Sequence, residues 1–246
     1  GRERKRAEER ATDALRTPVM WRNVKRTLDA VQPRALSWRR ASIFVPGVPK
    51  KLDDVLKLDL VRDKPPQDIA HLWTAYHGDD AELTAATLQD DEYTRLAERA
   101  AESPAFFFPL RRGTGHISLY SQYNPTLSML GITSLEAWQR SPELAPPWMS
   151  VHFFGELLVT KRLGLLRAEA SSDHLSRAEV DTLLRLVLTF YGSDKYDRVW
   201  VMNHMPQRFN VDQYVQLALS EQMSEDATKA AAELPGSSQP CDAEIR

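Results

Sequence analysis

Six histidines are the first residues in this chain whose side chains could bind a metal or move a proton. The closest pair is His71 and His77, but a spacing of six places the two rings on different faces of a helix. No HExxH motif and no paired carboxylates at ligand spacing accompany them. Of the others, His116, His152 and His204 lie on expected strands or at their ends, and His174 lies in a polar loop. We therefore predict structural or surface histidines and no metal ion.

The glycines and nucleophiles also lack the setting that catalysis needs. Gly113 and Gly115 lie between two expected strands, whereas a phosphate-binding loop leads from a strand into a helix. No GxSxG elbow is present, and the only cysteine, Cys241, lies in a polar tail. These features predict no cofactor, no small-molecule substrate and no catalytic activity. A hydrolase assembled from scattered His, Asp and Ser residues is a minor alternative, because catalytic groups converge in space.

Charge divides the chain into a basic beginning and an acidic remainder. Residues 1–50 hold 13 Lys and Arg against 5 Asp and Glu, and residues 51–246 hold 19 against 29, so the two parts carry about +8 and −10. Such an arm contacts nucleic acid, anionic lipid or an acidic protein, or is simply a solvated extension. A nucleic-acid-binding module using the arm, with Trp21 and Trp38 among its bases, is the alternative function, although the acidic body shows no RNA-binding signature.

Three regions follow from length and composition. Residues 1–50 form the basic, partly helical extension, and residues 51–219 form a domain large enough for a substantial core. Residues 220–246 form a flexible polar tail with too few apolar groups to offset the entropy of ordering. No apolar run approaches the roughly 20 residues that span a bilayer, so we expect no stable membrane insertion. The single cysteine allows no internal disulfide, as in proteins of reducing compartments.

A helix with a strongly apolar stripe is expected at residues 65–77. Pro65 and Pro66 suit its first turn, where a missing N–H costs nothing, and Gly78 suits a left-handed end. Spacings of i, i+3, i+4 and i+7 place four apolar residues on one face: Ile69, Leu72, Trp73 and Tyr76. This stripe faces either the core or a partner.

The rest of the domain has the pattern of short strands and helices in no regular alternation. Strands are expected at residues 105–110, 115–122, 148–154, 163–168 and 198–203, the first two as a hairpin. Helices are expected at residues 52–60, 87–103, 176–192 and 210–219, with a short one around Trp138 capped by Thr133 and Glu136. This order favours an α+β fold, a mostly antiparallel sheet flanked by helices with an extended N-terminal arm.

Five segments appear along the chain in an order that identifies a family resemblance. They are LDDVLKLDL followed by IAHLWTAYH (52–77), PAFFFPLRRGTGHISLYSQY (104–123), TSLEAW (133–138), the segment 147–170, and LTFYG with VMNHMPQRFNVDQY (188–214). Together they resemble the assembly factors that chaperone the beta subunit of mitochondrial ATP synthase. The resemblance covers roughly residues 51–219.

The resemblance implies an ATP-independent chaperone of the mitochondrial matrix. A factor of this family binds the unassembled ATP synthase beta subunit, prevents its aggregation and is displaced by the alpha subunit. The first residues of this chain are rich in acids as well as arginine, unlike a transit peptide, and the chain does not start with methionine. We therefore expect it to begin after a processing boundary, and the mitochondrial location comes from the resemblance.

Exposed aromatic and apolar side chains are the expected contacts with such a client. The candidates are Trp73, Tyr76, Phe107, Trp148, Met149 and Phe209. For each of them, packing in the core is the alternative. The run Phe106 to Phe108 sends at least one ring to the opposite face of its strand, so either both faces are covered or one ring is exposed. An exposed sheet edge is the other kind of contact that we expect.

Overall fold

The protein is described here from a computed structural model over residues 49–78 and 82–232. Within these ranges six strands form one antiparallel sheet in the order β1-β6-β5-β4-β3-β2. The strands are β1 (Leu83–Gln89), β2 (Ala105–Arg112), β3 (Gly115–Asn124), β4 (Met129–Ser134), β5 (Met149–Phe154) and β6 (Leu163–Ala170). The predicted α+β class, with a mostly antiparallel sheet, is confirmed. The predictions for the basic arm, with Trp21 and Trp38, and for Cys241 lie outside the described residues.

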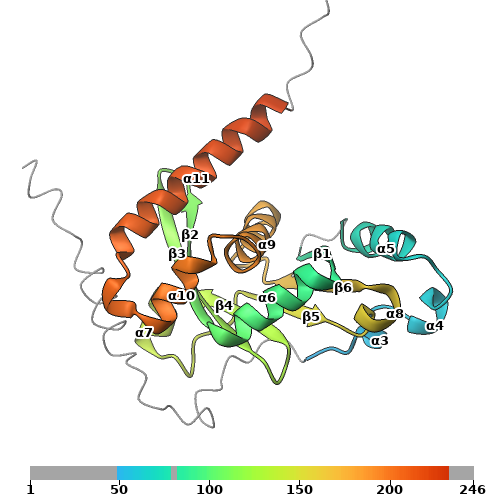
Figure 1. The fold of residues 1–246 in the computed structure, drawn as a ribbon. Helices are drawn as coiled ribbons and strands as arrows, with labels where there is room; N and C mark the ends of the chain where they lie inside the picture. The colour runs from blue at the N-terminus through green and yellow to red at the C-terminus, as the bar shows by residue number, and fades with distance from the viewer. Residues whose placement is uncertain (1–48, 79–81, 233–246) are drawn as a thin grey trace, which may run out of the picture.

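Helices pack on both faces of this sheet (Figure 1). They are α3 (Leu52–Val55), α4 (Leu58–Val61), α5 (Pro66–Gly78), α6 (Asp90–Glu102), α7 (Leu135–Arg140), α8 (Leu158–Lys161), α9 (Arg177–Gly192), α10 (Tyr196–His204), the 3-10 helix η1 (Pro206–Arg208) and α11 (Val211–Ala232). In Figure 1, α3, α4, α5 and α8 gather at one end of the molecule, and α11 extends away from the body.

Successive side chains of each strand point to opposite faces of the sheet, so the core is divided into two layers. On one side, which we call the α9 face, Phe108, Val151 and Leu166 pack with residues of α6, α9, α10 and α11 in the main core. On the other side, the α5 face, Leu165 belongs to a smaller core with Trp73 and residues of α3 and α4. The three phenylalanines of β2 are all buried, so the prediction that both faces are covered is confirmed.

Several predicted elements are confirmed with their local causes. The β2–β3 hairpin turns at Gly113, whose φ of 59° is left-handed, so this glycine serves turn geometry. Helix α5 begins at Pro66, and α9 begins with the predicted capping box between Ser176 and Glu179. Strands β5 and β6 lie where residues 148–154 and 163–168 predicted them.

Other predictions were wrong at the level of single elements. Residues 87–89 were predicted helical but end strand β1, because pairing with β6 outweighs local propensity. Residues 198–203 were predicted as a strand but form α10, which turns Val199 and Met202 into the main core. Strand β4 was missed. Residues 52–60 form two single-turn helices instead of one helix.

Three helix ends also differ from the sequence prediction. The cap of α7 is Ser134, which accepts from the Ala137 N–H at 3.2 Å, whereas Thr133 donates to the Pro146 carbonyl at 2.6 Å. Gly78 has no left-handed φ. The last helix, predicted to end near residue 219, continues to Ala232. The division into residues 51–219 and a flexible tail stays a prediction.

A close approach between α6 and β6 gives a first testable expectation. A Cβ added at Gly164 would lie 2.6 Å from the Cβ of Tyr93 and would also overlap its ring. Because the contact is near the backbone of α6, neither partner can easily move. We expect Gly164→Ala to lower the free energy of unfolding by about 1–3 kcal/mol, measured by urea denaturation.

The matched control is Gly115→Ala, because the nearest atom to an added Cβ there is a carbonyl oxygen 4.0 Å away. This control should unfold at the midpoint of the unsubstituted protein. Equal midpoints for the two variants would show that Tyr93 does not pack against β6 as described.

Candidate interaction surface

The structure separates the six predicted contact residues by burial. Trp73, Phe107 and Met149 are buried within the protein. Trp148 and Phe209 are half-buried, and the Trp148 ring stacks on His174. Tyr76 is 68% exposed. The structure therefore does not bring the six side chains together, and their role in partner binding stays a prediction.

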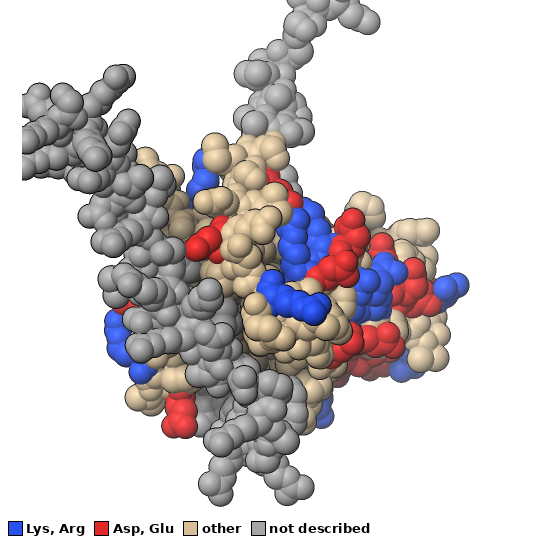
Figure 2. Space-filling view, turned by 60° about the vertical axis from the view of Figure 1, so that its left-hand side comes forward, with Lys and Arg blue, Asp and Glu red and all other residues tan. Residues whose placement is uncertain are grey.

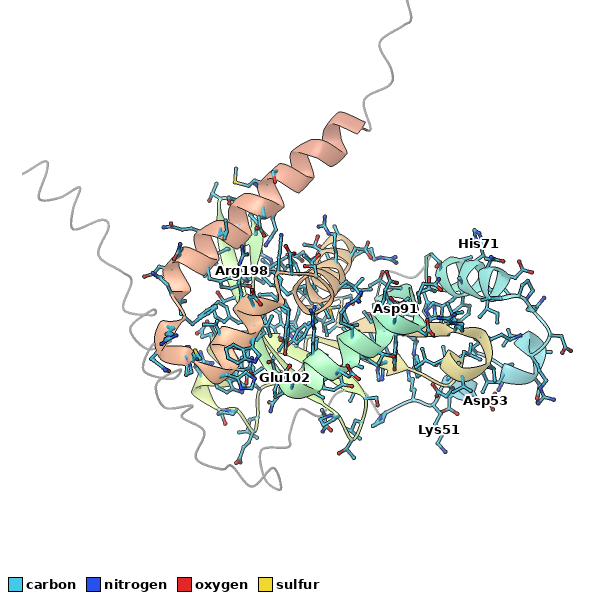
Figure 3. The ribbon with its side chains drawn as sticks, viewed as in Figure 1. Lys51, Asp53, His71, Asp91, Glu102 and Arg198 are labelled. Carbon is cyan, nitrogen blue, oxygen red and sulfur yellow. The ribbon has the colours of Figure 1, made fainter. Side chains whose placement is uncertain are left out.

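Helix α5 is split lengthwise between core and solvent. Ile69 and Trp73 face inward, and the Trp73 indole donates to the Leu166 carbonyl of β6 at 3.0 Å. Leu72 and Tyr76, spaced i and i+4, remain 47% and 68% exposed; we call this pair the α5 outer face. Figure 3 shows the exposed His71 on the same helix, pointing away from the body. The predicted apolar stripe thus has one buried half and one exposed half.

Two cations hold α5 rigidly at its ends. Lys161 of α8 donates to the carbonyls of Arg62 and Lys64 at 2.6 and 2.9 Å, which fixes the turn before the helix. Arg177 of α9 donates to the carbonyls of His77 and Gly78 at 3.3 and 3.2 Å. Cations suit the carbonyl end of a helix. The α5 outer face is therefore presented by a fixed element.

Further apolar side chains are exposed at the same end of the molecule. Leu60 on α4 is 74% exposed and Val159 on α8 is 95% exposed. Both helices lie with α5 in Figure 1. Single exposed apolar residues are ordinary in folded proteins, but several on neighbouring elements are typical of an interaction surface.

The free edge of β2, by contrast, is closed by side chains of α10 and α11. Residues 105, 107, 109 and 111 direct their backbone groups away from β3. The Asn203 amide accepts from the N–H and donates to the carbonyl of Ala105, at 3.1 and 2.6 Å. Tyr214 donates to the Phe107 carbonyl at 2.9 Å. Gln222 donates to the Pro109 carbonyl at 2.7 Å and accepts from the N–H of residue 111 at 3.2 Å.

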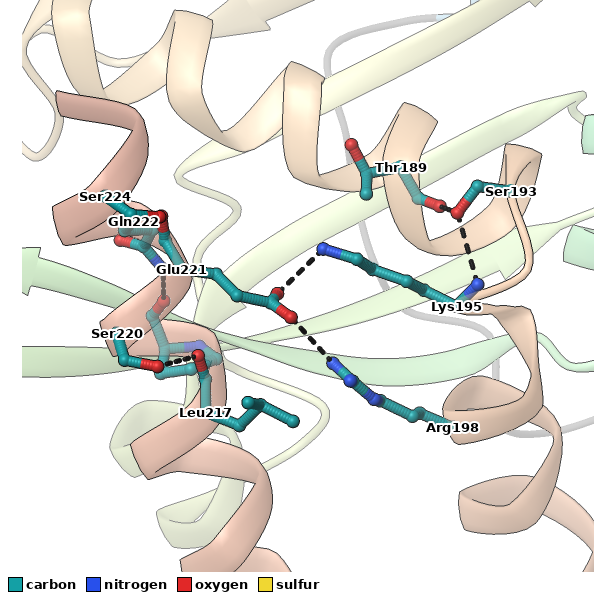
Figure 4. A network of polar contacts seen from close by, with 10 residues as sticks. Thr189, Ser193, Lys195, Arg198, Leu217, Ser220, Glu221, Gln222 and Ser224 are labelled. Carbon is teal, nitrogen blue, oxygen red and sulfur yellow. Dashed lines mark hydrogen bonds and ion pairs between the residues drawn. The ribbon is translucent and has the colours of Figure 1, made fainter. Parts of the chain in front are cut away.

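Ion pairs hold α11 in this position. Lys195 and Arg198 converge on Glu221 at 2.8 and 3.6 Å (Figure 4). The neighbouring Gln222 is buried, although it lies beyond residue 219. An edge strand blocked in this way does not pair with another chain. The sheet edge expected as a contact is therefore not the edge at β2.

A charged cluster lies on the α5 face of β5 and β6. Glu169 accepts from Lys50 at 2.6 Å and pairs with Arg167, and His152 lies 3.9 Å from Glu169. Burial would raise the pKa of Glu169, but the Lys50 hydrogen bond and the Arg167 charge lower it. Burial is the main cause that lowers the pKa of His152, against the attraction of Glu169. The cluster ties the start of the described chain to the sheet.

These pKa directions predict sensitivity to acid. Because the pKa of His152 is below its ordinary value of 6.5, the unfolded chain takes up that proton first, and the free energy of unfolding falls as the pH drops below 6.5. The contribution of Glu169 is present above 4.5 and is lost as the pH falls through its lowered pKa. We expect His152→Asn to flatten the decline in stability that begins at pH 6.5.

Urea denaturation at a series of pH values measures this decline. His116, whose pKa burial also lowers, leaves a residual slope in the variant. A decline as steep in His152→Asn as in the unsubstituted protein would show that protonation of His152 does not oppose folding.

A serine and a histidine also meet in this structure, as a hydrolase would require. Ser103 Oγ lies 3.2 Å from His204 Nε2 and 2.9 Å from the Tyr196 hydroxyl. Ser103 is completely buried at the end of α6, so no substrate carbonyl can reach its hydroxyl. The contact joins α6 to α10. Among the described residues, no group of three or more His, Cys, Asp or Glu side chains could hold a metal ion.

Surface charge and helix composition bear on the other classes of partner. On the face shown in Figure 2, basic and acidic side chains are interspersed over the described residues. None of the helices in the described ranges is both long and apolar enough to cross a bilayer. The basic arm, on which the nucleic-acid alternative depends, lies outside the described residues.

The fold defines an α+β protein with one antiparallel sheet between helical layers and an exposed apolar helix face at one end. The model of the ATP11 protein family matches residues 21–217, and the chain belongs to this family.

Curated relatives agree with this membership. The chain is 26% identical over 163 residues to proteins named ATP synthase mitochondrial F1 complex assembly factor 1. The match covers 65% of this chain, with 53% of the Danio rerio protein and 49% of the Homo sapiens protein. Protein atp11, mitochondrial, of Schizosaccharomyces pombe is 26% identical over 149 residues, which cover 58% of this chain and 51% of that protein. The chain thus spans about half the length of these relatives.

Proposed function

We propose that this protein is an ATP-independent chaperone in the assembly of the F1 part of mitochondrial ATP synthase. Its client is the unassembled beta subunit, which it keeps from aggregating and releases to the alpha subunit in the mitochondrial matrix. Membership of the ATP11 protein family and the printed names of the relatives support this role.

The exposed α5 outer face is the structural observation that carries the proposal. A subunit awaiting its partner exposes apolar surface, and a chaperone covers that surface with apolar side chains of its own. Leu72 and Tyr76 offer such side chains on a helix that is fixed at both ends. Tyrosine is also among the residues that contribute most to binding energy at interfaces. Binding of this kind needs no catalytic group.

Release to the alpha subunit follows from competition. Two proteins that cover the same surface of the beta subunit exclude one another, so the one with the higher affinity displaces the other. Displacement therefore requires that the chaperone bind the beta subunit more weakly than the alpha subunit does.

Capture and release of purified subunits test the proposal. The protein should bind unassembled beta subunit in a pull-down, suppress its light scattering on dilution from denaturant, and leave it when alpha subunit is added. Bovine serum albumin is the control for nonspecific suppression. Absence of binding under conditions that keep the beta subunit soluble would refute the proposal.

A further inference from the structure

Strand β1 is the second edge of the sheet, and its hydrogen-bonding direction can be read from one contact. The Ala170 N–H donates to the Glu82 carbonyl at 2.9 Å, and the register places these residues opposite each other. In an antiparallel pair, hydrogen-bonded positions alternate. Every second residue therefore turns its backbone groups toward β6, beginning with Thr84. The intervening residues Leu83, Ala85 and Thr87 direct their N–H and C=O groups outward.

These outward groups have no partner within residues 49–78 and 82–232. No side chain or backbone atom of these ranges forms a hydrogen bond with the outer N–H or C=O of Leu83, Ala85 or Thr87. The β2 edge differs sharply, because Asn203 and Gln222 complete its backbone hydrogen bonds. Within the described ranges, one edge of the sheet is thus closed by side chains, and the other has no such hydrogen-bond partners.

The composition of β1 also lacks the usual devices that prevent strand addition. Its sequence, LTAATLQ, contains no charged residue and no proline, and its pairing with β6 is continuous without a bulge. Natural edge strands are commonly protected by lysine, proline or bulges. Residues on both faces of β1 pack on apolar clusters, Ala85 on the smaller core and Ala86 and Leu88 on the main core.

The surroundings of β1 favour a single extended chain over a second copy of this domain. Helices α5 and α9 both pack against β1 (Figure 1). An added strand needs only about 4.8 Å of space beside the edge. A second copy would bring its own α5 and α9 to the same place, so four helices would compete for the space beside two edges.

We propose that the outer edge of β1 is a strand-addition site for an extended, uncharged segment of the client, with apolar side chains on both of its faces. Such a segment pairs with the N–H and C=O groups of Leu83, Ala85 and Thr87 and adds a seventh strand to the sheet. This inference names how the client binds and so rests on the proposed function.

A matched pair of substitutions at one position tests the site. Thr87→Pro removes an outward N–H and adds a ring on the outer edge, but leaves the hydrogen bonds to β6 in place. Thr87→Val keeps the N–H and has nearly the same volume. We expect Thr87→Pro to weaken capture of unassembled beta subunit at least tenfold and Thr87→Val to leave it unchanged. Ala85→Pro is the second proline variant, and unfolding midpoints confirm that each variant folds.

Hydrogen exchange by NMR on the unsubstituted protein gives a readout that needs no variant. The amides of Leu83, Ala85 and Thr87 should exchange freely in the free protein and at least tenfold more slowly in the complex. Equal capture by the proline and valine variants, or unchanged exchange on binding, overturns the strand-addition site and leaves the chaperone function intact. Protection already present in the free protein, whether from dimers or from another segment of this chain, overturns it as well.

A probe independent of the client separates the two proposals. If the protein captures no beta subunit, the proposed function fails, and a synthetic peptide then tests the edge of β1 by itself. Its sequence, LGLLQAQA, is that of β6 with glutamine in place of Arg167 and Glu169, so it is uncharged and carries apolar side chains on both faces. At millimolar concentration this peptide should slow exchange at the same three amides, because it keeps the apolar residues of the strand that pairs with β1. Exchange that stays unchanged with the peptide overturns the strand-addition site.

Discussion

Replacing Trp73 with alanine is expected to destabilise the protein by about 3–5 kcal/mol, the range for truncating a buried large aromatic residue. The side chain is 1% exposed and lies in the smaller core against Phe154 and Leu165. Its truncation leaves a cavity and also removes the hydrogen bond to the Leu166 carbonyl. The loss is a large share of the stability of a typical domain.

Urea denaturation of Trp73→Ala and Trp73→Phe measures this effect. Phenylalanine keeps most of the packing and loses the hydrogen bond, so it should lie between the alanine variant and the unsubstituted protein. If Trp73→Ala keeps the unfolding midpoint of the unsubstituted protein but no longer binds the beta subunit, then Trp73 is an interface residue and is not packed in the core as described.

Replacing Leu72 and Tyr76 together by serine is expected to give the opposite result. Both side chains are exposed, so the free energy of unfolding should change by less than about 0.5 kcal/mol per site. Capture of the beta subunit should weaken by about 2 kcal/mol or more, roughly 30-fold in the dissociation constant, if the pair is central to the interface.

Fluorescence titration with purified beta subunit measures the affinity, and Leu144→Ser is the control. Leu144 is 81% exposed and follows α7 in the sequence, and α7 lies at the opposite end of the molecule from α5 in Figure 1. Its replacement should leave the affinity unchanged. Equal affinities for the double variant and the control would remove the α5 outer face from the interface.

The sequence was a good guide to elements whose signals are local. The turn at Gly113, the capping box of Ser176 and Glu179, and the prolines before α5 depend on neighbouring residues, and the structure confirms the elements that they predicted. The family resemblance, carried by five ordered segments, is confirmed in the same way by the match over residues 21–217.

Prediction failed where distant partners decide the conformation. Residues 87–89 contain good helix formers, but they end a strand because β6 supplies the partners for their backbone groups. Residues 198–203 contain β-branched and aromatic residues, but they are helical because Val199 and Met202 then face the main core. No local sequence pattern predicts that Asn203 and Gln222 form hydrogen bonds with the outer backbone groups of β2, since these contacts join residues about a hundred positions apart.

The same distinction applies to the candidate interaction surface. The sequence by itself determined that residues 65–77 form a helix with four apolar residues on one side, because helical periodicity is a local property. Only the tertiary structure decided that Ile69 and Trp73 face the core while Leu72 and Tyr76 face solvent. The physical reason is the geometry of packing. Strand β6 and the smaller core cover only part of the wide apolar stripe of α5, and the sequence alone does not determine how much of that stripe is covered.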